Sequence, residues 1–261
     1  MSDYDRNATA RFGTGVARGA ERAVDLGLRD YMLSVYNYMA LGLAITGLAA
    51  IGTFMAAVTG DPTGAAAQVR EGVYLTSFGY ALFASPLKWL VILAPLGLVF
   101  FLSARISSMS VSGAQIAFWV FAGLMGLSLS SIFLVYTGGS IARVFFITAA
   151  SFGALSLYGY TTKRDLSGMG SFLIMGLFGI IIASVVNIFL GSTMLQFVVS
   201  VVGVLVFAGL TAYDTQRIKE MYDVNDDGTL AGRKAIMGAL SLYLNFINMF
   251  TMLLSLFGNR E

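Results

Sequence analysis

Two long apolar stretches joined by a very short link decide the fold class of this chain. They read 168-GMGSFLIMGLFGIIIASVVNIFL-190 and 194-MLQFVVSVVGVLVFAGLTA-212, and the link between them is at Gly191 and Ser192, followed by Thr193. Each approaches the ~20 residues with which a helix crosses ~30 Å of hydrocarbon at ~1.5 Å per residue. The link is too short for any arrangement except an antiparallel hairpin. This region is therefore predicted to fold with lipid, not water, as its solvent.

The rest of the chain follows the same pattern and predicts an all-α integral membrane protein with seven transmembrane helices. The second stretch, Trp89 to Ala104, is ambiguous. Its apolar run could begin as early as Val73, but Pro86 and Lys88 interrupt it. The piece from Val73 to Ala84 is therefore interpreted as interfacial or re-entrant. The seven stretches are Met32 to Val58, Trp89 to Ala104, Gln115 to Tyr136, Val144 to Tyr160, Gly168 to Leu190, Met194 to Ala212 and Ile236 to Phe257.

The composition agrees with a membrane protein and excludes several other classes. Hydrophobic residues make up 57% of the 261 residues and charged residues only 11%, far less charge than a soluble domain of this length carries. With no Cys, the chain has neither structural disulfides nor thiolate chemistry. With no His, proton sensing near neutral pH would need a perturbed carboxylate. The net charge of +2 is too small and dispersed to indicate nucleic acid as a partner.

Residues 1–30 differ from everything after them, because they combine five Arg with five acidic residues and no apolar block. They lack the apolar core and small-residue cleavage pattern of a signal peptide. We interpret this segment as a cytoplasmic tail with a short surface helix, and residues 31–261 as a single seven-helix transmembrane domain.

The distribution of Lys and Arg predicts the orientation. With the N-terminus inside, twelve of these residues fall on the cytoplasmic side and four on the other, the bias expected of cytoplasmic loops. Seven crossings would then leave the C-terminus outside. If the last segment dips into the membrane and returns, the C-terminus is inside, and Arg260 alone does not decide between the two.

Asp214 is the carboxylate that the sequence places at membrane depth, near the end of the sixth stretch. An ionised carboxylate there costs several kcal/mol unless it is paired or hydrated, which favours a functional group facing the interior of the bundle. The alternative is an interfacial Asp214 that pairs with Arg217 one turn later. Position alone does not separate these two interpretations.

A polar stripe runs along the seventh stretch. Its members, Ser241, Asn245, Asn248, Thr251 and Ser255, recur every three or four residues and so share one face of a helix. Such a face should contact other helices or a wet cavity, which places this helix centrally; its alternative role is interhelical hydrogen bonding alone. We assign Ser184, Asn187 and the glycine pairs at 42 and 47 and at 176 and 179 to close helix packing.

No motif for catalysis or for a resident metal is found. Asp223, Asn225, Asp227 and Gly228 match the first half of a calcium loop, but Lys234 stands where a bidentate Glu is required. The segment is therefore interpreted as a polar turn. There is also no phosphate-binding loop, nucleophile elbow or zinc spacing, so we expect neither an enzyme nor a bound cofactor.

Three motifs resemble the Bax inhibitor-1 family in its bacterial branch, and the resemblance covers residues 31–260. Members of that family place six helices around a central seventh and are described as pH-sensitive calcium leak channels. In animals and plants they suppress cell death, and some bacterial relatives bind and restrain a membrane-anchored AAA protease in stress responses. The motifs are FAGLTAYDTQR at Phe207–Arg217, SLYGYTTKRDLS at Ser156–Ser167 and GALSLYLNFIN at Gly238–Asn248.

The resemblance also implies a latch for the pore. Family members pair two carboxylates that share a proton, and these positions correspond to Asp214 and Asn245 here. Asn245 departs from the pattern, because an Asp–Asn pair lacks the like-charge repulsion on which the shared proton depends. The contact could persist while its pH response changes or disappears. An Arg near the end of the second helix corresponds approximately to Arg105, whose alternative role is a positive-inside anchor.

Two functions from different classes follow for a multi-pass protein of a bacterial inner membrane. The first is a calcium or other cation leak pathway, with calcium drawn to Asp214 and with Asn245, Asn248 and Ser241 along the route. The second is a regulator that binds a membrane-bound protease through its tail and loops. Because Asn245 replaces the second carboxylate of the latch, the regulator gains weight, but the leak pathway still ranks first.

Overall fold

The apolar stretches fold into long helices, because a backbone in hydrocarbon must satisfy its own hydrogen bonds. The computed structural model describes residues 3–260, with side chains from residue 26 onward. Seven of its helices are long and apolar enough to cross a membrane, which confirms the predicted fold class. The α-helices are α1 (Asp3–Ala57), α2 (Ser77–Phe83), α3 (Leu87–Arg105), α4 (Val111–Leu129), α5 (Gly138–Thr161), α6 (Ser167–Leu190), α7 (Thr193–Glu220) and α8 (Gly228–Phe257).

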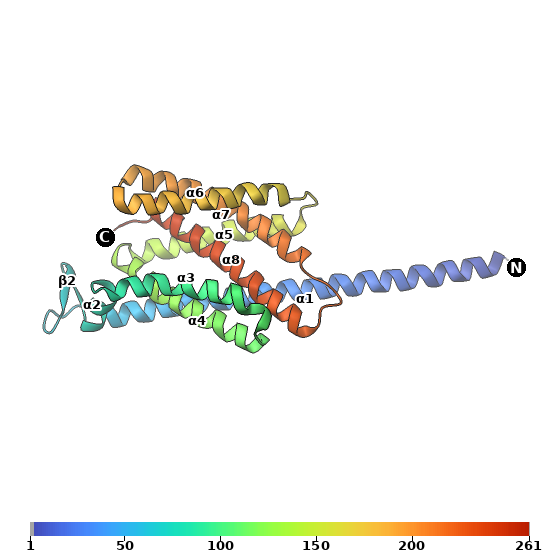
Figure 1. Ribbon diagram of the computed structural model, residues 1–261, viewed down its shortest axis with the longest axis horizontal. Coiled ribbons are helices and arrows are strands. Elements are labelled where there is room, and N and C mark those ends of the chain that lie inside the picture. Colours follow the sequence, from blue (N-terminus) through green and yellow to red (C-terminus); the bar gives the residue numbers. More distant parts are fainter. Residues whose placement is uncertain (1–2, 261) are drawn as a thin grey trace.

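Helix α1 is longer than the sequence indicated. It runs without interruption from Asp3, so the predicted tail continues directly into the first span instead of forming a separate short helix. Its N-terminal part projects well beyond the bundle (Figure 1). The apolar span itself begins at Leu26. Met1, Ser2 and Glu261, which the predicted domain limits include, lie outside the described residues.

The ambiguous piece from Val73 to Ala84 does not form a membrane-spanning helix. It forms strand β3 (Val73–Leu75), which lies between β1 (Val58–Thr59) and β2 (Ala67–Arg70) in an antiparallel sheet, and then the short helix α2. Thr76 caps α2 by accepting a hydrogen bond from the Gly79 N–H at 3.1 Å. Together these elements cap one end of the bundle (Figure 1), and the second span begins only at α3.

The predicted hairpin between the two deciding stretches is confirmed, and α6 and α7 pack against each other. Helix α6 ends at Gly191, whose φ of 59° is left-handed and therefore favours glycine. Ser192 then caps α7 by accepting a hydrogen bond from the Leu195 N–H at 3.2 Å. Two adjacent residues thus end one helix and start the next.

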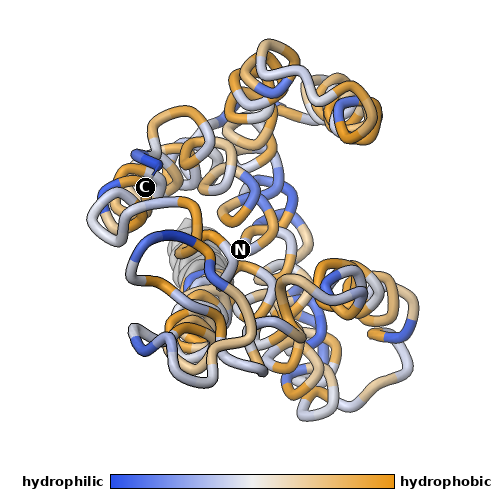
Figure 2. The backbone as a smooth tube through the Cα atoms, turned by 90° about the vertical axis from the view of Figure 1, so that its left-hand side faces the viewer, coloured by the Kyte–Doolittle hydropathy of each residue, from blue (hydrophilic) through white to orange (hydrophobic). Residues whose placement is uncertain are grey.

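Helix α8 occupies the centre of the bundle but contacts four of the six other spans, not all of them. It packs against α1, α4, α5 and α7, whereas α3 packs mainly on α4 and α6 on α7. In Figure 2, which looks along the bundle, most of the helical backbone is coloured as hydrophobic. The expected ring of six helices is therefore an inner group of four and two outer helices.

The centre of α8 is held by one aromatic cluster. The Tyr243 ring meets Phe118 and Phe121 of α4 edge-on, at centroid distances of 6.0 Å and 5.2 Å. The Tyr243 hydroxyl forms a 2.6 Å hydrogen bond with Thr46 Oγ1 of α1. A buried Tyr hydroxyl needs such a partner, so this contact ties α1, α4 and α8 together.

Candidate functional site

The structure brings Asp214 and Asn245 into direct contact across the α7–α8 interface. The Asn245 side-chain Nδ2 donates to Asp214 Oδ2 at 2.7 Å. Asn245 is only 5% exposed, and Asp214 is half-buried six residues before α7 ends at Glu220. A hydrogen bond to a charged group is short and strong where water is excluded. The contact therefore holds the two helices together at this level.

The structure supports the alternative pairing of Asp214 with Arg217 only weakly. Arg217 is exposed and among residues 3–260 forms no salt bridge within 4.0 Å with Asp214, although its charge still acts on that carboxylate electrostatically. The hydrogen bond from Asn245 is the one that Asp214 accepts within this part of the chain. A carboxylate offers about four acceptor positions, so Asp214 retains capacity for water or a cation.

The rest of the α8 stripe continues away from this contact. Asn248 Nδ2 donates to the Leu244 carbonyl and Thr251 Oγ1 to the Asn248 carbonyl, each at 2.9 Å. These bonds turn the groups toward their own helix and leave their remaining polar atoms available. Ser241 is half-buried one turn before Asn245. The stripe thus contacts α7 through Asn245, but its other four members are only half-buried, and the most buried face of α8 is the apolar one that carries Tyr243, Phe246 and Phe250.

A polar pocket of about 480 Å³ lies further along the same stripe, between α6, α7 and α8. We name it the α6–α8 pocket. Thr251, the first stripe residue to line it, is six residues beyond Asn245, or about 9 Å along the helix. Its polar lining consists of Ser184, Asn187, Gln196, Ser200, Thr251 and Ser255.

Two of these lining residues correct a prediction. Ser184 and Asn187 were assigned to helix packing, yet both face the α6–α8 pocket. Asn187 also uses its Oδ1 to accept the Ser192 N–H at 2.9 Å, which stabilises the turn into α7. As in the α8 stripe, these polar residues are three positions apart in an otherwise apolar helix. Two such residues were too few to distinguish a pocket lining from helix packing.

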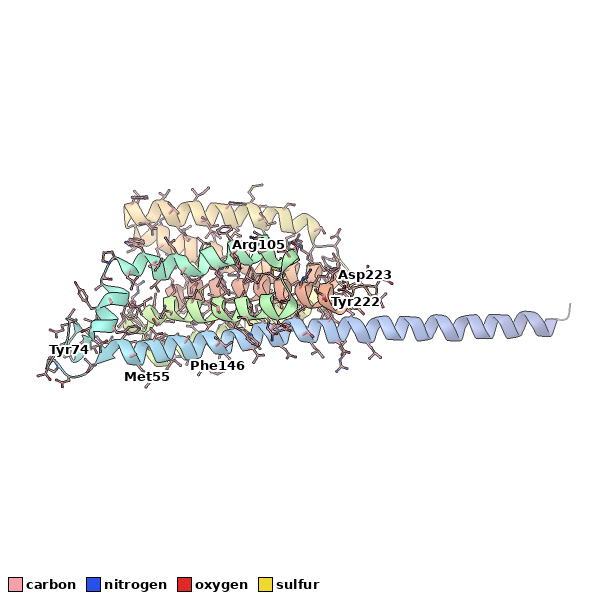
Figure 3. All side chains as sticks on the ribbon, turned by 60° about the horizontal axis from the view of Figure 1, so that its bottom comes forward. Met55, Tyr74, Arg105, Phe146, Tyr222 and Asp223 are labelled. Carbon is pink, nitrogen blue, oxygen red and sulfur yellow. The ribbon has the colours of Figure 1, made fainter. Side chains whose placement is uncertain are left out.

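Arg105 is not part of the contact. It lies at the end of α3, is exposed, and within residues 3–260 makes no hydrogen bond to Asp214 or Asn245. Figure 3 shows it toward the same end of the bundle as Tyr222 and Asp223. Helix α3 packs mainly on α4, so Arg105 does not bond the Asp214–Asn245 contact in this structure, and its role as a latch or an anchor stays a prediction.

The acidic residues in the connection between α7 and α8 bond to nearby protein groups. Asp227 caps α8 by accepting the Leu230 N–H at 2.6 Å, and Asp226 pairs with Lys234 at 2.5 Å. The backbone and side-chain N–H groups of Asn225 lower the pKa of Asp223. Within the described part of the chain, no three His, Cys, Asp or Glu residues cluster as a metal site would need.

Sequence reasoning missed a chain of hydroxyls beside the contact. The Tyr36 hydroxyl of α1 lies 2.7 Å from Ser156 Oγ of α5, which lies 3.0 Å from Thr215 Oγ1 of α7. Thr215 in turn donates to the Thr211 carbonyl at 2.7 Å. Ser156 and Thr215 belong to two of the motifs quoted above, and Thr215 adjoins Asp214. The chain fixes the Asp214 segment of α7 against its neighbours.

These features define a polytopic helical membrane protein with a carboxylate–amide contact at its central helix. The family described as "Inhibitor of apoptosis-promoting Bax1" matches residues 28–261, and the chain belongs to this Bax inhibitor-1 family. It is 47% identical over 239 residues to the inner membrane protein YbhL of Escherichia coli, covering 90% of this chain and 94% of that one.

Two other relatives match almost the whole chain. A Rickettsia prowazekii protein described as uncharacterized is 45% identical over 261 residues and is covered completely, as is this chain. A Caulobacter vibrioides protein, also described as uncharacterized, is 44% identical over 257 residues, which is 96% of this chain and 99% of that one. The similarity therefore includes the tail as well as the membrane domain.

Proposed function

We propose that this protein is a cation leak pathway, with calcium as the favoured ion, which the Asp214–Asn245 contact holds closed. The observation that carries the proposal is the 2.7 Å hydrogen bond between a half-buried carboxylate and the central helix. A carboxylate with free acceptor positions attracts cations electrostatically. Its amide partner must move away before an ion can pass.

The rest of the route is supported by the polar stripe. Between Asp214 and the α6–α8 pocket, Asn248 and Thr251 are half-buried on the same face of α8, and Thr251 lines the pocket. The proposal needs neither a resident cofactor nor a chemical step. The relative named an inner membrane protein supports that membrane as the location, and the Lys and Arg distribution supports a cytoplasmic N-terminus.

Two substitutions with opposite expected effects test the role of the contact in liposomes that contain the purified protein. Asn245→Ala removes the latch but keeps the charge, so calcium flux should rise. A hydrogen bond to a charged group is worth about 1.5–3 kcal/mol, so the closed state should weaken roughly tenfold or more. Asp214→Asn keeps an amide partner for Asn245 but loses the charge, so calcium flux should fall.

The matched control for these variants is Asp223→Asn, which neutralises an exposed carboxylate in the α7–α8 connection. Its flux should equal that of the natural protein. If Asp214→Asn and Asp223→Asn behave alike, Asp214 has no role in conduction and the assignment fails.

The pH response is tested with Asn245→Asp. Two carboxylates at this contact distance repel each other and share a proton, so the variant should gain a pH-dependent step in flux that the natural Asp–Asn pair lacks. The measurement is flux against pH for both proteins. Identical profiles would show that the contact does not control the pathway.

The projecting part of α1 favours a second function, binding of a membrane-bound protease. A helix that extends far beyond the bundle offers a partner a surface outside the membrane (Figure 1). Removal of residues 1–25 leaves the span that begins at Leu26 complete. Co-purification of a protease that is lost with this segment but survives Asp214→Ala would support the regulator, whereas calcium flux without any partner would support the channel.

A further inference from the structure

A groove runs along the membrane face of the bundle between α1 and α5. Both helices pack on α8, but two cavities of about 460 Å³ and 770 Å³ lie end to end between them. We call the two together the α1–α5 groove. Its lining extends over residues 29–51 of α1 and 138–160 of α5, so it runs for about 33 Å, the thickness of the hydrocarbon core.

The wall of the groove is hydrocarbon almost throughout. Phe246 and Phe250 of α8 form the floor of the larger cavity, and Ile141 and Phe145 of α5 form one side. Apart from that of Tyr160 at one end, the hydroxyl groups in the groove are already occupied: Tyr36 bonds Ser156, and Thr46 bonds Tyr243 and the Ala122 carbonyl. Beyond Tyr160 a polar ligand would find no free hydroxyl partner, whereas an acyl chain needs none.

Three glycines keep the groove open. Gly47, Gly138 and Gly153 line it, and a Cβ built on any of them would meet no atom within 4 Å. Tightly packed glycines behave differently, since a Cβ on Gly159 would lie 2.2 Å from the Ala212 carbonyl. The open glycines therefore do not serve close helix packing, although the sequence analysis assigned that role to Gly47.

The end of the groove nearest the N-terminal extension has two positive charges nearby. Arg29 lines the smaller cavity from α1. Lys219 of α7 does not line it, but its Nζ donates to the carbonyl of the lining residue Tyr160 at 2.9 Å and lies 5.3 Å from the centroid of the Tyr160 ring. An ammonium group has three donors, so Lys219 can bond an anion as well. Basic groups at the mouth of an interhelical groove suit an anionic lipid headgroup.

We propose that the α1–α5 groove binds an anionic phospholipid of the bilayer, with its phosphate between Arg29 and Lys219 and one acyl chain along the groove toward Phe250. The groove is as long as the whole hydrocarbon core and therefore longer than one leaflet, so it has room for a fully extended acyl chain. Its wall is apolar like the chain, and the positive charge at its mouth suits the headgroup. This site is separate from the Asp214–Asn245 contact and does not depend on the proposed ion flux.

Acyl-chain occupancy is tested by native mass spectrometry of the purified full-length protein with added phosphatidylglycerol. Gly47→Leu and Gly153→Leu should fill the groove without a backbone clash and reduce retained lipid several-fold. The matched control is Gly52→Leu on the same α1 helix, where a Cβ also meets no atom within 4 Å but which does not line the groove. Equal lipid retention in all three variants would overturn the proposal.

The headgroup site is tested by competition between phosphatidylglycerol and phosphatidylcholine. Arg29→Gln should reduce the preference for the anionic lipid several-fold, whereas Arg143→Gln, an exposed cation elsewhere on α5, should leave it unchanged. No preference in the natural protein would mean bulk lipid only and would overturn the proposal. Asp214→Ala should retain lipid, which separates this test from the flux experiments.

A second copy of the chain is the competing occupant. If light scattering shows that Gly47→Leu dissociates a dimer while Gly52→Leu does not, the groove is a protein interface and the lipid proposal is wrong. A monomer that loses phosphatidylglycerol with Gly47→Leu supports it. Thermal unfolding of each variant verifies that the fold is intact.

Discussion

Between helices α6 and α8, the more apolar helix is the less buried one, which is the opposite of what is found in a water-soluble protein. The most apolar 18-residue window of α6 has a mean hydropathy of 2.6 and is 11% buried, whereas that of α8 has 1.6 and is 56% buried. In water the more apolar helix would form the core. In lipid an apolar surface loses nothing by exposure, so polar groups decide which helix goes inside.

The same contrast explains where the candidate site lies. Asn245 of the α8 stripe is buried and donates to Asp214, whereas Ser184 and Asn187 of α6 line the α6–α8 pocket. The exposed surface of α6 is mostly apolar. Four predictions test this contrast, from the largest expected effect to the smallest.

The largest effect should come from a charge on the exposed face of α6. Ile182 is 63% exposed. Ile182→Asp should therefore destabilise the inserted protein by about 3 kcal/mol, the cost of an Asp near the centre of a membrane helix. Asn248→Asp on the α8 stripe should cost clearly less, because that side chain is half-buried. Unfolding measured in bicelles compares the two; equal losses would contradict the contrast.

A smaller loss is expected where two helices touch through a glycine. Gly159→Ala places a Cβ against the Ala212 carbonyl of α7 and should cost about 1–3 kcal/mol through overpacking. Gly153→Ala, six residues earlier on the same α5 helix, meets no atom within 4 Å and serves as the matched control. Thermal unfolding in detergent should separate the two variants. Equal midpoints would mean that α5 and α7 do not pack as closely as the structure shows.

Substitution of the residue before α8 should lower stability more than substitution of the residue before α6. Asp227 caps α8, whereas Leu166 before α6 offers no side-chain cap. Asp227→Ala should therefore cost about 1 kcal/mol, the usual value of a lost N-cap. The comparison is Asp223→Ala in the same connection, which caps no helix and should cost less. A larger loss for Asp223→Ala would contradict the assignment of the cap.

The smallest effect concerns pH at the start of α6. The hydroxyl and the backbone N–H of Ser167 lower the pKa of Asp165. A carboxyl whose pKa is lowered on folding adds stability above its unfolded value of about 4 and loses it as pH falls further. The melting temperature of Asp165→Asn should therefore fall less than that of the natural protein between about pH 5 and pH 3. Parallel curves would show that the bond adds nothing.

The path of the chain was largely predictable because each span is long and apolar. All seven spans, the Gly191 hairpin and the shared face of the polar residues of α8 follow from residue spacing. The second span was ambiguous because Val73 to Ala84 is apolar enough for a membrane, yet β3 and α2 form there instead. The local sequence does not show that strand pairing and the Thr76 cap stabilise an alternative to a membrane-spanning helix.

The sequence by itself determined that this chain is a membrane protein, that its last helix is central, and that Asp214 and Asn245 are the candidate site residues. Only the tertiary structure decided that these two touch, that Arg105 stands apart, and that Ser184 and Asn187 face a pocket. It also decided which glycines are packed and which leave a groove open. The physical reason is that hydrophobic pattern selects a solvent, whereas contacts between helices depend on how neighbouring surfaces fit together.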